Sequence, residues 1–383
     1  MIAVIADDFT GAAEIGGIGL RYGLTAEILY EHVAPSEAAL LIIDANTRSL
    51  TNEQAIERTV KLTADLKALN PQLIYKKVDS ALRGFIVDEI NTQLKVLDLK
   101  RALLIPANPA LGRTIINGQY YLHQEPIHTT SFATDPEFGI TESTPHHMLR
   151  VGESDVQVRT PAEGIANQGI TIGEIHGVED LAAWAAQIVP QTLLAGGSGF
   201  FAALMDARFA QTPLPTDFSL SKPRLYVSGS AFEKSKKLVE QLARRKNLVS
   251  YMPHALVQAQ NPPQRLFDNW TDEVVSLLQT NQTAVVAVHE STTQPGETNP
   301  HDVRDKTATV VASAFNRAEI KELLIEGGST AAAIINKLGL KKFTPVNEFS
   351  TGVIRMKADG HNDLLMTLKP GSYDWPPYIW DFE

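Results

Sequence analysis

The sequence predicts an α/β protein of two domains, each a mostly parallel sheet flanked by helices, with a cleft between the domains. Three observations support this fold class. Short apolar runs recur along the chain, and most are followed by a segment with helical spacing. A proline-rich stretch of low apolar content, residues 211–223, interrupts this alternation. Finally, the 383 residues exceed what a single domain of roughly 100–200 residues accommodates.

The alternation is clearest in the N-terminal half of the chain. We expect strands at Met1–Ala6, Ala39–Ile43, Leu73–Val78, Ala102–Ile105, Ile170–Ile175 and Thr192–Ala195. We expect helices at Gly11–Tyr22, Glu53–Leu69, Val87–Leu97, Val178–Val189 and Phe200–Ala210. Between Leu111 and Gly164 the pattern breaks into a stretch rich in His, Thr and Pro, which we interpret as an insertion over the edge of the sheet.

A linker at Gln211–Asp217 is expected to separate a first domain, residues 1–215, from a second domain, residues 222–383. The second domain begins with a strand at Arg224. Further strands are expected at Ala284–Val288 and Glu322–Ile325, helices at Val303–Ala318 and Thr330–Leu338, and β structure at Gly352–Leu368.

The composition excludes several functional classes. A formal net charge of −10 argues against nucleic acid as a partner, because such proteins present a basic face. The chain has no cysteine, which excludes disulfides, zinc–thiolate sites, iron–sulfur clusters and thiol nucleophiles. No apolar run approaches the roughly 20 residues of a membrane span, and the N-terminus lacks the basic region of a signal peptide. We therefore expect a cytoplasmic protein without a membrane partner.

Two carboxylates, Asp7 and Asp8, stand at the end of the first predicted strand, and Thr10 and Gly11 then open a helix. In open α/β sheets, ligands bind at this end of the strands. An aspartate can accept hydrogen bonds from a polyol, orient a cation or accept a proton, and the free N–H groups of a helix start suit an anion. A simpler interpretation, that Asp8 and Thr10 only cap the helix, is equally open.

A second cluster, Lys76-Lys77-Val78-Asp79-Ser80-Ala81-Leu82-Arg83-Gly84, also follows a predicted strand. Its lysines and Arg83 can hold a carboxylate, Arg83 in bidentate fashion. Asp79 and Ser80 can hold hydroxyl groups. A salt-bridged loop with a capping Ser or Asp would use the same residue types. Because two such clusters follow neighbouring strands, we favour a binding site over a purely structural role.

Glycine-rich turns follow three strands of the second domain. Ile325-Glu326-Gly327-Gly328-Ser329-Thr330 leads into an alanine-rich helix, where backbone N–H groups could approach a phosphate. It is not a P-loop, because no lysine follows in the required position. Val227-Ser228-Gly229-Ser230 and Leu368-Lys369-Pro370-Gly371 could form further walls of a nucleotide site. Each of these turns, taken alone, is also compatible with a plain turn.

No metal site is predicted. His123, His128, His146 and His147 all fall in the insertion, but they lack the spacing of known metal-binding motifs. Histidines in a polar loop are usually exposed side chains without a ligand.

Taken together, these motifs resemble the four-carbon acid sugar kinases. The resemblance rests on Asp7-Asp8-Phe9-Thr10-Gly11-Ala12, on Lys77-Val78-Asp79-Ser80-Ala81-Leu82-Arg83-Gly84 and on Gly327-Gly328-Ser329-Thr330, in that order, with Val227-Ser228-Gly229-Ser230 and Lys369-Pro370-Gly371 as looser matches. It covers essentially the whole chain.

The resemblance implies an ATP- and Mg²⁺-dependent kinase that phosphorylates the terminal, usually 4-, hydroxyl of a sugar acid such as threonate or erythronate. Its small-molecule partners would be the acid, bound by the N-terminal domain, and ATP, bound by the C-terminal domain. The implied catalytic residues are Asp8, Asp79 and Arg83, and the implied substrate contacts also include Asp7, Thr10, Lys77 and Ser80. The implied nucleotide contacts are Ser228, Ser230, Gly327, Gly328, Ser329, Thr330 and Gly371.

Two positions depart from the family pattern. Ser329 stands where an acidic residue is usual, and Ala81 stands where Thr is usual. A non-catalytic sensor of sugar acid or nucleotide is therefore the alternative. A dehydrogenase is disfavoured, because no G-x-G-x-x-G follows the first strand. The sequence does not decide which acid is used or which carboxylate acts as base, and a homodimer is compatible with it.

Overall fold

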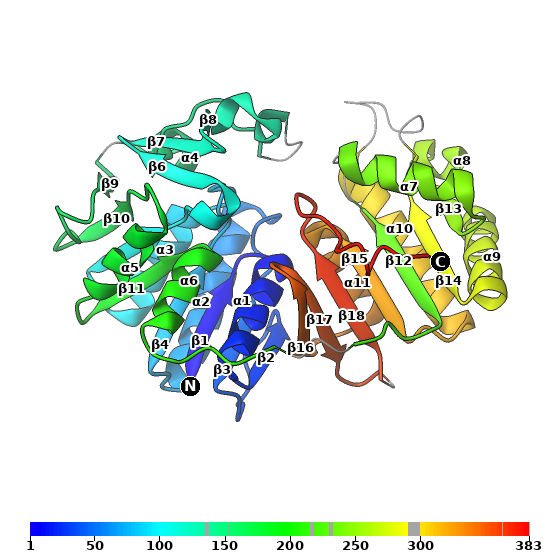
Figure 1. Ribbon diagram of the computed structural model, residues 1–383, viewed down its shortest axis with the longest axis horizontal. Helices are drawn as coiled ribbons and strands as arrows, with labels where there is room; N and C mark the ends of the chain where they lie inside the picture. The colour runs from blue at the N-terminus through cyan, green and yellow to red at the C-terminus, as the bar shows by residue number, and fades with distance from the viewer. Residues whose placement is uncertain are drawn as a thin grey trace. The chain divides into compact units, whose positions relative to one another are not determined.

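The computed structural model describes residues 1–134, 138–152, 154–214, 218–229, 233–289, 299–361 and 363–382. The chain forms two compact units, Met1–Pro213 and Leu214–Glu383, which are described separately here (Figure 1). Both are α/β units built on a mostly parallel sheet, so the predicted fold class is confirmed.

The sheet of the first unit is parallel throughout its described pairings. Strand β1 lies between β3 and β4, and every residue of β1 and β3 is buried, as expected for a parallel sheet covered on both faces. In sheet order the strands are β2 (Ala26–Tyr30), β3 (Leu40–Asp44), β1 (Ile2–Ala6), β4 (Leu73–Lys77), β11 (Thr192–Gly196), β5 (Arg101–Ile105), β10 (Gly169–Gly173) and β9 (Val156–Arg159).

Helices cover both faces of this sheet. On one face α1 (Phe9–Arg21) and α5 (Val178–Ala186) both pack against α6 (Ser198–Asp206), and on the other α2 (Asn52–Ala68) packs against α3 (Ile86–Leu97). Helix α1 contains four glycines, and it approaches the sheet closely. A Cβ at Gly19 would lie 2.7 Å from a terminal side-chain carbon of Leu40, so a larger residue there would require Leu40 to shift.

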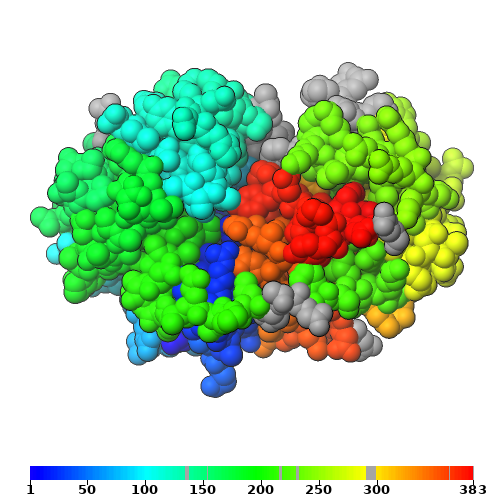
Figure 2. Space-filling model, in the orientation of Figure 1, coloured from blue at the N-terminus to red at the C-terminus, as the bar shows by residue number. Residues whose placement is uncertain are grey.

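The region predicted as an insertion is more regular than expected. It forms a small antiparallel sheet of β6 (Arg113–Ile116), β7 (Gln119–Leu122) and β8 (Glu125–Pro126), and it also supplies the edge strand β9. Short helices join these strands: η1 (Pro109–Leu111), η2 (Ile127–Thr129), η3 (Ser131–Thr134) and α4 (Pro145–Leu149). The small sheet lies at the surface of the unit, near the carboxyl ends of the central strands (cyan in Figures 1 and 2).

The second unit has a mixed sheet. Counted in sheet order, the first five strands are parallel to one another. The sixth strand is antiparallel to the fifth, and the seventh is antiparallel to the sixth. In sheet order they are β13 (Val249–Tyr251), β14 (Thr283–Ala287), β12 (Arg224–Ser228), β15 (Glu322–Glu326), β18 (Leu365–Lys369), β17 (Val353–Ala358) and β16 (Lys342–Ser350).

Helices α9 (Gln264–Asn281), α10 (Pro300–Arg317) and α11 (Gly328–Leu338) pack together in the second unit, and α8 (His254–Gln258) contacts α9. An aromatic core around Tyr226 joins α7 (Glu233–Arg245) to the C-terminal segment through Leu242, Trp375 and Ile379. No helix in the described ranges is long and apolar enough to cross a membrane.

Several elements were not predicted. Strand β2 is interrupted by Glu27, and α7 buries only Ser235, Val239 and Leu242 along 13 residues. Helix α7 contains few apolar residues, and β2 is only five residues long with a charged residue at its second position.

A buried ion pair ties β4 to α3. The Nζ of Lys76 donates to the carboxylate of Glu89, and both side chains are almost fully enclosed. Replacing Lys76 with Met leaves a buried carboxylate without its partner. We expect the free energy of unfolding in urea to fall by about 3–5 kcal/mol. Lys61→Ala, which removes an exposed pair with Asp65, is the control and should cost no more than about 1 kcal/mol. Equal losses for the two variants would contradict the prediction.

Candidate functional site

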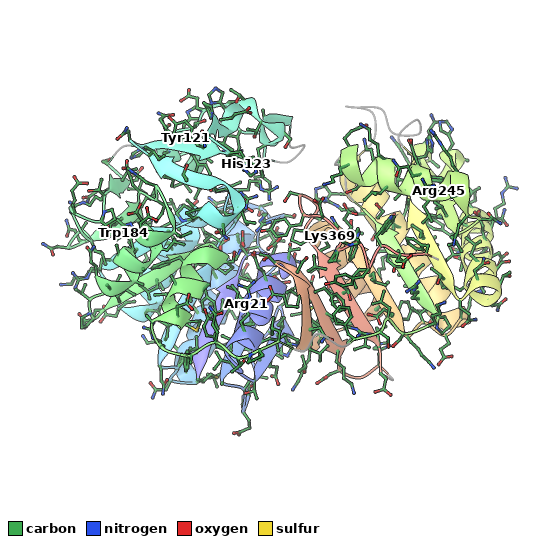
Figure 3. All side chains as sticks on the ribbon, in the orientation of Figure 1. Arg21, Tyr121, His123, Trp184, Arg245 and Lys369 are labelled. Carbon is green, nitrogen blue, oxygen red and sulfur yellow. The ribbon has the colours of Figure 1, made fainter. Side chains whose placement is uncertain are left out.

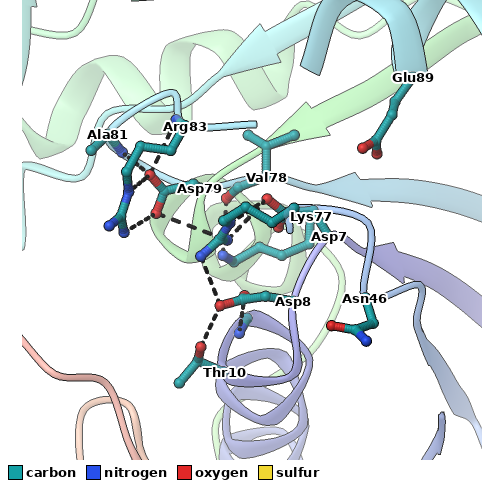
Figure 4. Close-up of polar contacts among 12 residues, drawn as sticks. Asp7, Asp8, Thr10, Asn46, Lys77, Val78, Asp79, Ala81, Arg83 and Glu89 are labelled. Carbon is teal, nitrogen blue, oxygen red and sulfur yellow. Dashed lines mark hydrogen bonds and ion pairs between the residues drawn. The ribbon is translucent and has the colours of Figure 1, made fainter. Parts of the chain in front are cut away.

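The candidate site of the first unit lies where the chain reverses its direction across the sheet. Helix α1 follows β1 toward β2, whereas α3 follows β4 toward β5, although β1 and β4 are neighbours. Crevices at the carboxyl ends of such strands are the usual ligand sites of open α/β sheets. Asp7 and Asp8 follow β1, and Asp79 to Arg83 follow β4, so the two predicted clusters are brought together here (Figure 4).

Asp8 begins helix α1. Its Oδ1 accepts a hydrogen bond of 2.8 Å from the N–H of Gly11, and its Oδ2 accepts one from the hydroxyl of Thr10. A Cβ at Gly11 would lie 2.9 Å from Asp8 Oδ1 and 3.0 Å from Lys77 Nζ, so a larger residue there would displace these two charged groups. The capping interpretation of Asp8 is therefore right, and the same carboxylate also belongs to the charged cluster.

Arg48 is the centre of this cluster, and the sequence analysis did not identify it. Its Nε lies 3.0 Å from Asp7 Oδ2, its Nη1 2.7 Å from Asp8 Oδ2, and its Nη2 3.9 Å from Asp79 Oδ1. The N–H groups of Thr47 and Arg48 also donate to the carbonyl of Asp7. A signal was present, because Arg48 follows a third apolar strand at the same edge of the sheet.

Arg83 binds Asp79 in bidentate geometry. Its Nε lies 2.7 Å from Oδ2, and its Nη2 lies 3.0 Å from Oδ1. The N–H groups of Ala81 and Arg83 add hydrogen bonds of 3.2 Å each to Oδ2. The guanidinium that was expected to hold a ligand carboxylate therefore already holds one from the protein.

The two lysines of β4 point to opposite faces of the sheet, as alternate residues of a strand do. Lys77 lies beside the cluster, where its Nζ donates to the carbonyl of Val78 and lies 3.7 Å from Glu14. Lys76 faces α3 and pairs with Glu89, away from the cluster. Of the two lysines, only Lys77 is placed to contact a ligand.

The small antiparallel sheet contacts the second cluster. Arg113 on β6 donates to the hydroxyl of Ser80, and Tyr120 on β7 donates to its carbonyl. Phe132 lies under two guanidinium groups, with the Cζ atoms of Arg83 and Arg113 at 5.5 and 5.6 Å from its ring centre. The sequence analysis named neither Arg113, Tyr120 nor Phe132, because their partners are distant in sequence.

The histidines of the small-sheet region bond to protein groups. His128 Nδ1 lies 2.7 Å from the hydroxyl of Ser143, and His146 Nε2 lies 3.2 Å from the carbonyl of Val156. Within the residues described, no group of three or more metal-ligating side chains is found.

The second unit has the same strand order around its first strand as the first unit has around β1. Helix α7 follows β12 toward β13, whereas α11 follows β15, which lies on the other side of β12. The turns after β12, β15 and β18 lie at one edge of three adjacent strands, and they carry the predicted nucleotide residues Ser228, Gly327, Gly328, Ser329, Thr330 and Gly371. Ser230 lies outside the described residues.

These turns pack closely against one another. A Cβ at Gly229 would lie 2.0 Å from the Oγ1 of Thr330, and Gly327 has a φ of +98°, where a side chain is strained. Thr330 is buried beneath the turn, whereas Ser329 is exposed. The edge therefore presents backbone N–H groups and hydroxyls around the start of α11.

A buried ion pair supports the turn after β15. Lys369 on β18 (labelled in Figure 3) lies 3.1 Å from the carboxylate of Glu326, which also accepts a hydrogen bond from Ser235. The Nζ of Lys369 donates to the carbonyls of Pro370 and Tyr373 as well. Burial lowers the pKa of Lys369, and Glu326 opposes that shift. This network fixes the turns after β15 and β18.

Comparison with known proteins agrees with this division of the chain. A family described as a sugar-binding N-terminal domain matches residues 2–204, and one described as a nucleotide-binding C-terminal domain matches residues 225–373. The chain belongs to the four-carbon acid sugar kinase family. The resemblance on which the sequence analysis relied is thereby confirmed.

Relatives extend over nearly the whole of this four-carbon acid sugar kinase. A D-threonate kinase of Salmonella typhimurium is 25% identical, over 89% of this chain and 87% of the relative. A 3-oxo-tetronate kinase of Actinobacillus succinogenes is 24% identical, over 97% of this chain and 96% of the relative. The crystal structure of a Haemophilus influenzae protein superposes with a TM-score of 0.71 at 20% identity, over 99% of this chain and 98% of that one, which supports the fold.

The three aspartates around Arg48 in the kinase's first unit, Asp7, Asp8 and Asp79, differ in their pKa values. Burial raises the pKa of Asp7 more than Arg48 lowers it, and the neighbouring Asp8 raises it further. For Asp8 and Asp79 burial acts in the same direction, but nearby cations outweigh it. Arg48 holds the pKa of Asp8 below its usual range, and Arg83 with Arg48 holds that of Asp79 well below it. Asp8 and Asp79 are thus ionised at neutral pH.

Arg48→Met should destabilise the protein in a pH-dependent manner. Carboxylates with lowered pKa values stabilise the folded state above the unfolded pKa of about 3.9, and this contribution is lost as the pH falls. Without Arg48, we expect a loss of about 3 kcal/mol or more at pH 7 in urea denaturation, a smaller loss at pH 3.5, and a further decline of the loss as the pH falls through the folded pKa values of Asp8 and Asp79. The control is Arg58→Met, whose pair with Glu31 is partly exposed. A loss that does not change with pH would contradict the assigned charge network.

Proposed function

We propose that the chain is an ATP-dependent kinase that phosphorylates the terminal, 4-, hydroxyl of a four-carbon sugar acid such as D-threonate or D-erythronate. The observation that carries the proposal is the cluster of Asp7, Asp8 and Asp79 around Arg48, at the ligand-binding edge of a sheet in the unit that matches a sugar-binding domain. Relatives named D-threonate kinase and D-erythronate kinase support the choice of acid.

The first unit would hold the acid. A polyol donates several hydroxyl hydrogens, and carboxylates are their strongest acceptors. Oδ1 of Asp7 is enclosed and has no hydrogen-bond partner in the described part of the chain, so it is available to a ligand hydroxyl. Asp8 or Asp79 would orient the attacking hydroxyl, with Arg83, Thr10, Lys77 and Ser80 around them. Phosphoryl transfer needs mainly positioning and charge neutralisation, which suits such ionised groups.

The second unit would hold ATP. The residues fit a phosphate chain, because the turns offer hydroxyls from Ser228 and Ser329 and the backbone N–H of Gly328 at the start of an 11-residue helix. Gly327 shapes this turn with its positive φ, and its own N–H donates to the carbonyl of Lys369. Gly371 closes the same edge. Mg²⁺ would reach the site on the ATP phosphates and neutralise their charge, as is usual for this ion. That role needs no cage of three protein carboxylates, and none occurs among the described residues.

ADP release tests the proposal. The wild-type chain should release ADP from Mg-ATP in the presence of at least one acid from a panel of four- to six-carbon sugar acids. On that acid, Asp8→Asn and Arg83→Ala should lower kcat/KM by about 100-fold or more, because each removes a charge that positions the acceptor. Asp65→Asn, an exposed carboxylate on α2, is the control and should leave kcat/KM unchanged.

Two outcomes would contradict the proposal. Full activity in Asp8→Asn or Arg83→Ala would remove that residue from the catalytic set. Binding of an acid without any ADP release would instead support a non-catalytic sensor, for which Ser329 in place of the family's usual acidic residue is the motivating feature.

Gly229→Ala should weaken nucleotide binding. The added Cβ would collide with Oγ1 of Thr330 and displace the turn that offers N–H groups to the phosphates. Overpacking of about 1–3 kcal/mol corresponds to a rise of roughly 5- to 150-fold in the Kd for Mg-ATP, measured by calorimetry. Gly229→Ala/Thr330→Ala, which removes the nearest atom, should recover part of the affinity. An unchanged Kd in Gly229→Ala would contradict the placement of ATP at this turn.

A further inference from the structure

Arg113 is a buried cation without a counter-ion. It lies on β6, keeps 7% of its surface exposed, and donates through Nη1 to the hydroxyl of Ser80. Its Nε is enclosed and has no hydrogen-bond partner, and no carboxylate in the described ranges lies within ion-pair distance. The edge of the guanidinium formed by Nε and Nη2 is therefore unpaired.

The other cations around this site all have a protein carboxylate. Burying a charge costs several kcal/mol unless an opposite charge or a set of hydrogen bonds compensates it. The described pairs are Arg48 with Asp7 and Asp8, Arg83 with Asp79, Lys76 with Glu89, and Lys77 with Glu14. Arg113 departs from this rule, which is expected of a group whose counter-ion arrives with a ligand.

The position of Arg113 suits that role. It contacts Ser80, the residue that follows Asp79, and its guanidinium shares the ring of Phe132 with that of Arg83. Tyr120 holds the carbonyl of Ser80 from the same small sheet, so Arg113 is fixed relative to the cluster. Burial, Arg83 and Arg48 have the largest effects on the pKa of Asp79, and the charge of Arg113 adds a smaller lowering.

We infer that Arg113 binds the carboxylate of the sugar acid, and so selects acids over neutral sugars. The inference rests on the proposed function. A guanidinium edge of two N–H donors matches the two oxygens of a carboxylate, and the corresponding edge of Arg83 is already occupied by Asp79. The small sheet thus supplies acid specificity, while the carboxylates after β1 and β4 bind the hydroxyl groups.

The test compares each acid with its neutral amide. Calorimetry on the full chain would measure Kd for D-threonate and D-erythronate and for their amides, in the wild type, Arg113→Gln and Arg113→Lys. Loss of a charged hydrogen-bonding partner should weaken acid binding by about 10- to 100-fold in Arg113→Gln, with amide binding changed by less than about twofold. Arg113→Lys should recover part of the acid affinity, because it keeps the charge but not the fork.

Two controls separate recognition from structure. Arg150→Gln removes the same charge from an exposed position of the same region and should change neither Kd. A purely structural Arg113 would weaken acid and amide equally, and the unfolding temperature of Arg113→Gln would show whether the variant folds. If it does not fold, the ratio of acid to amide affinity in Arg113→Lys decides.

The outcomes distinguish this inference from the kinase proposal. Wild-type acid affinity in Arg113→Gln, or an equal loss for acid and amide, overturns the role of Arg113 alone. Acid binding without ADP release in the wild type overturns the kinase proposal and leaves the Arg113 comparison readable. A wild type that binds neither acid overturns both.

Discussion

The guanidinium of Arg48, held among three aspartates, is the interaction on which the first unit's site depends. Parallel strands place the carboxyl groups of Asp7, Asp8 and Asp79 at one edge of the sheet, where their negative charges would repel one another in a buried setting if no cation lay between them. Arg48 arrives from the neighbouring strand β3 and neutralises part of this charge. It also anchors its own loop to the carbonyl of Asp7, so the geometry of two strand ends and the start of α1 is set by one residue.

The two units share the strand order around their first strands, but they carry different chemistry there. In each, the motif-bearing turns follow the two strands at which the crossover connections diverge, β1 and β4 in one and β12 and β15 in the other. The first unit fills this edge with ionised carboxylates and cations, which suit a ligand with hydroxyl and carboxylate groups. The second lines the edge with glycine, serine and threonine, leaving backbone donors that suit phosphate. Both units place these turns at the carboxyl ends of adjacent strands, and the residues in the turns differ according to the ligand they suit.

Much of the fold could be predicted because its signals are local. Strand Ile2–Ala6 is buried on both faces and is a continuous apolar run, and Glu322–Glu326 is a buried strand with three apolar residues at its centre. Helix α7 was missed because only three of its 13 residues are buried, and β2 was missed although four of its five residues are buried. The antiparallel sheet of β6 to β8 escaped for a related reason, because its short strands are bounded by polar residues and stabilised by contacts with distant segments.

By itself the sequence determined where polar residues follow buried strands, and hence which segments meet at the ligand edge of each sheet. That inference needs only strand direction and the alternation of strand and helix. The tertiary structure alone decided the partners of each charged group. It turned Lys76 away toward Glu89, committed Arg83 to Asp79, brought in Arg48, and left Arg113 unpaired beside Ser80. Such pairings depend on distances of a few ångströms between segments far apart in the chain, which no local pattern encodes.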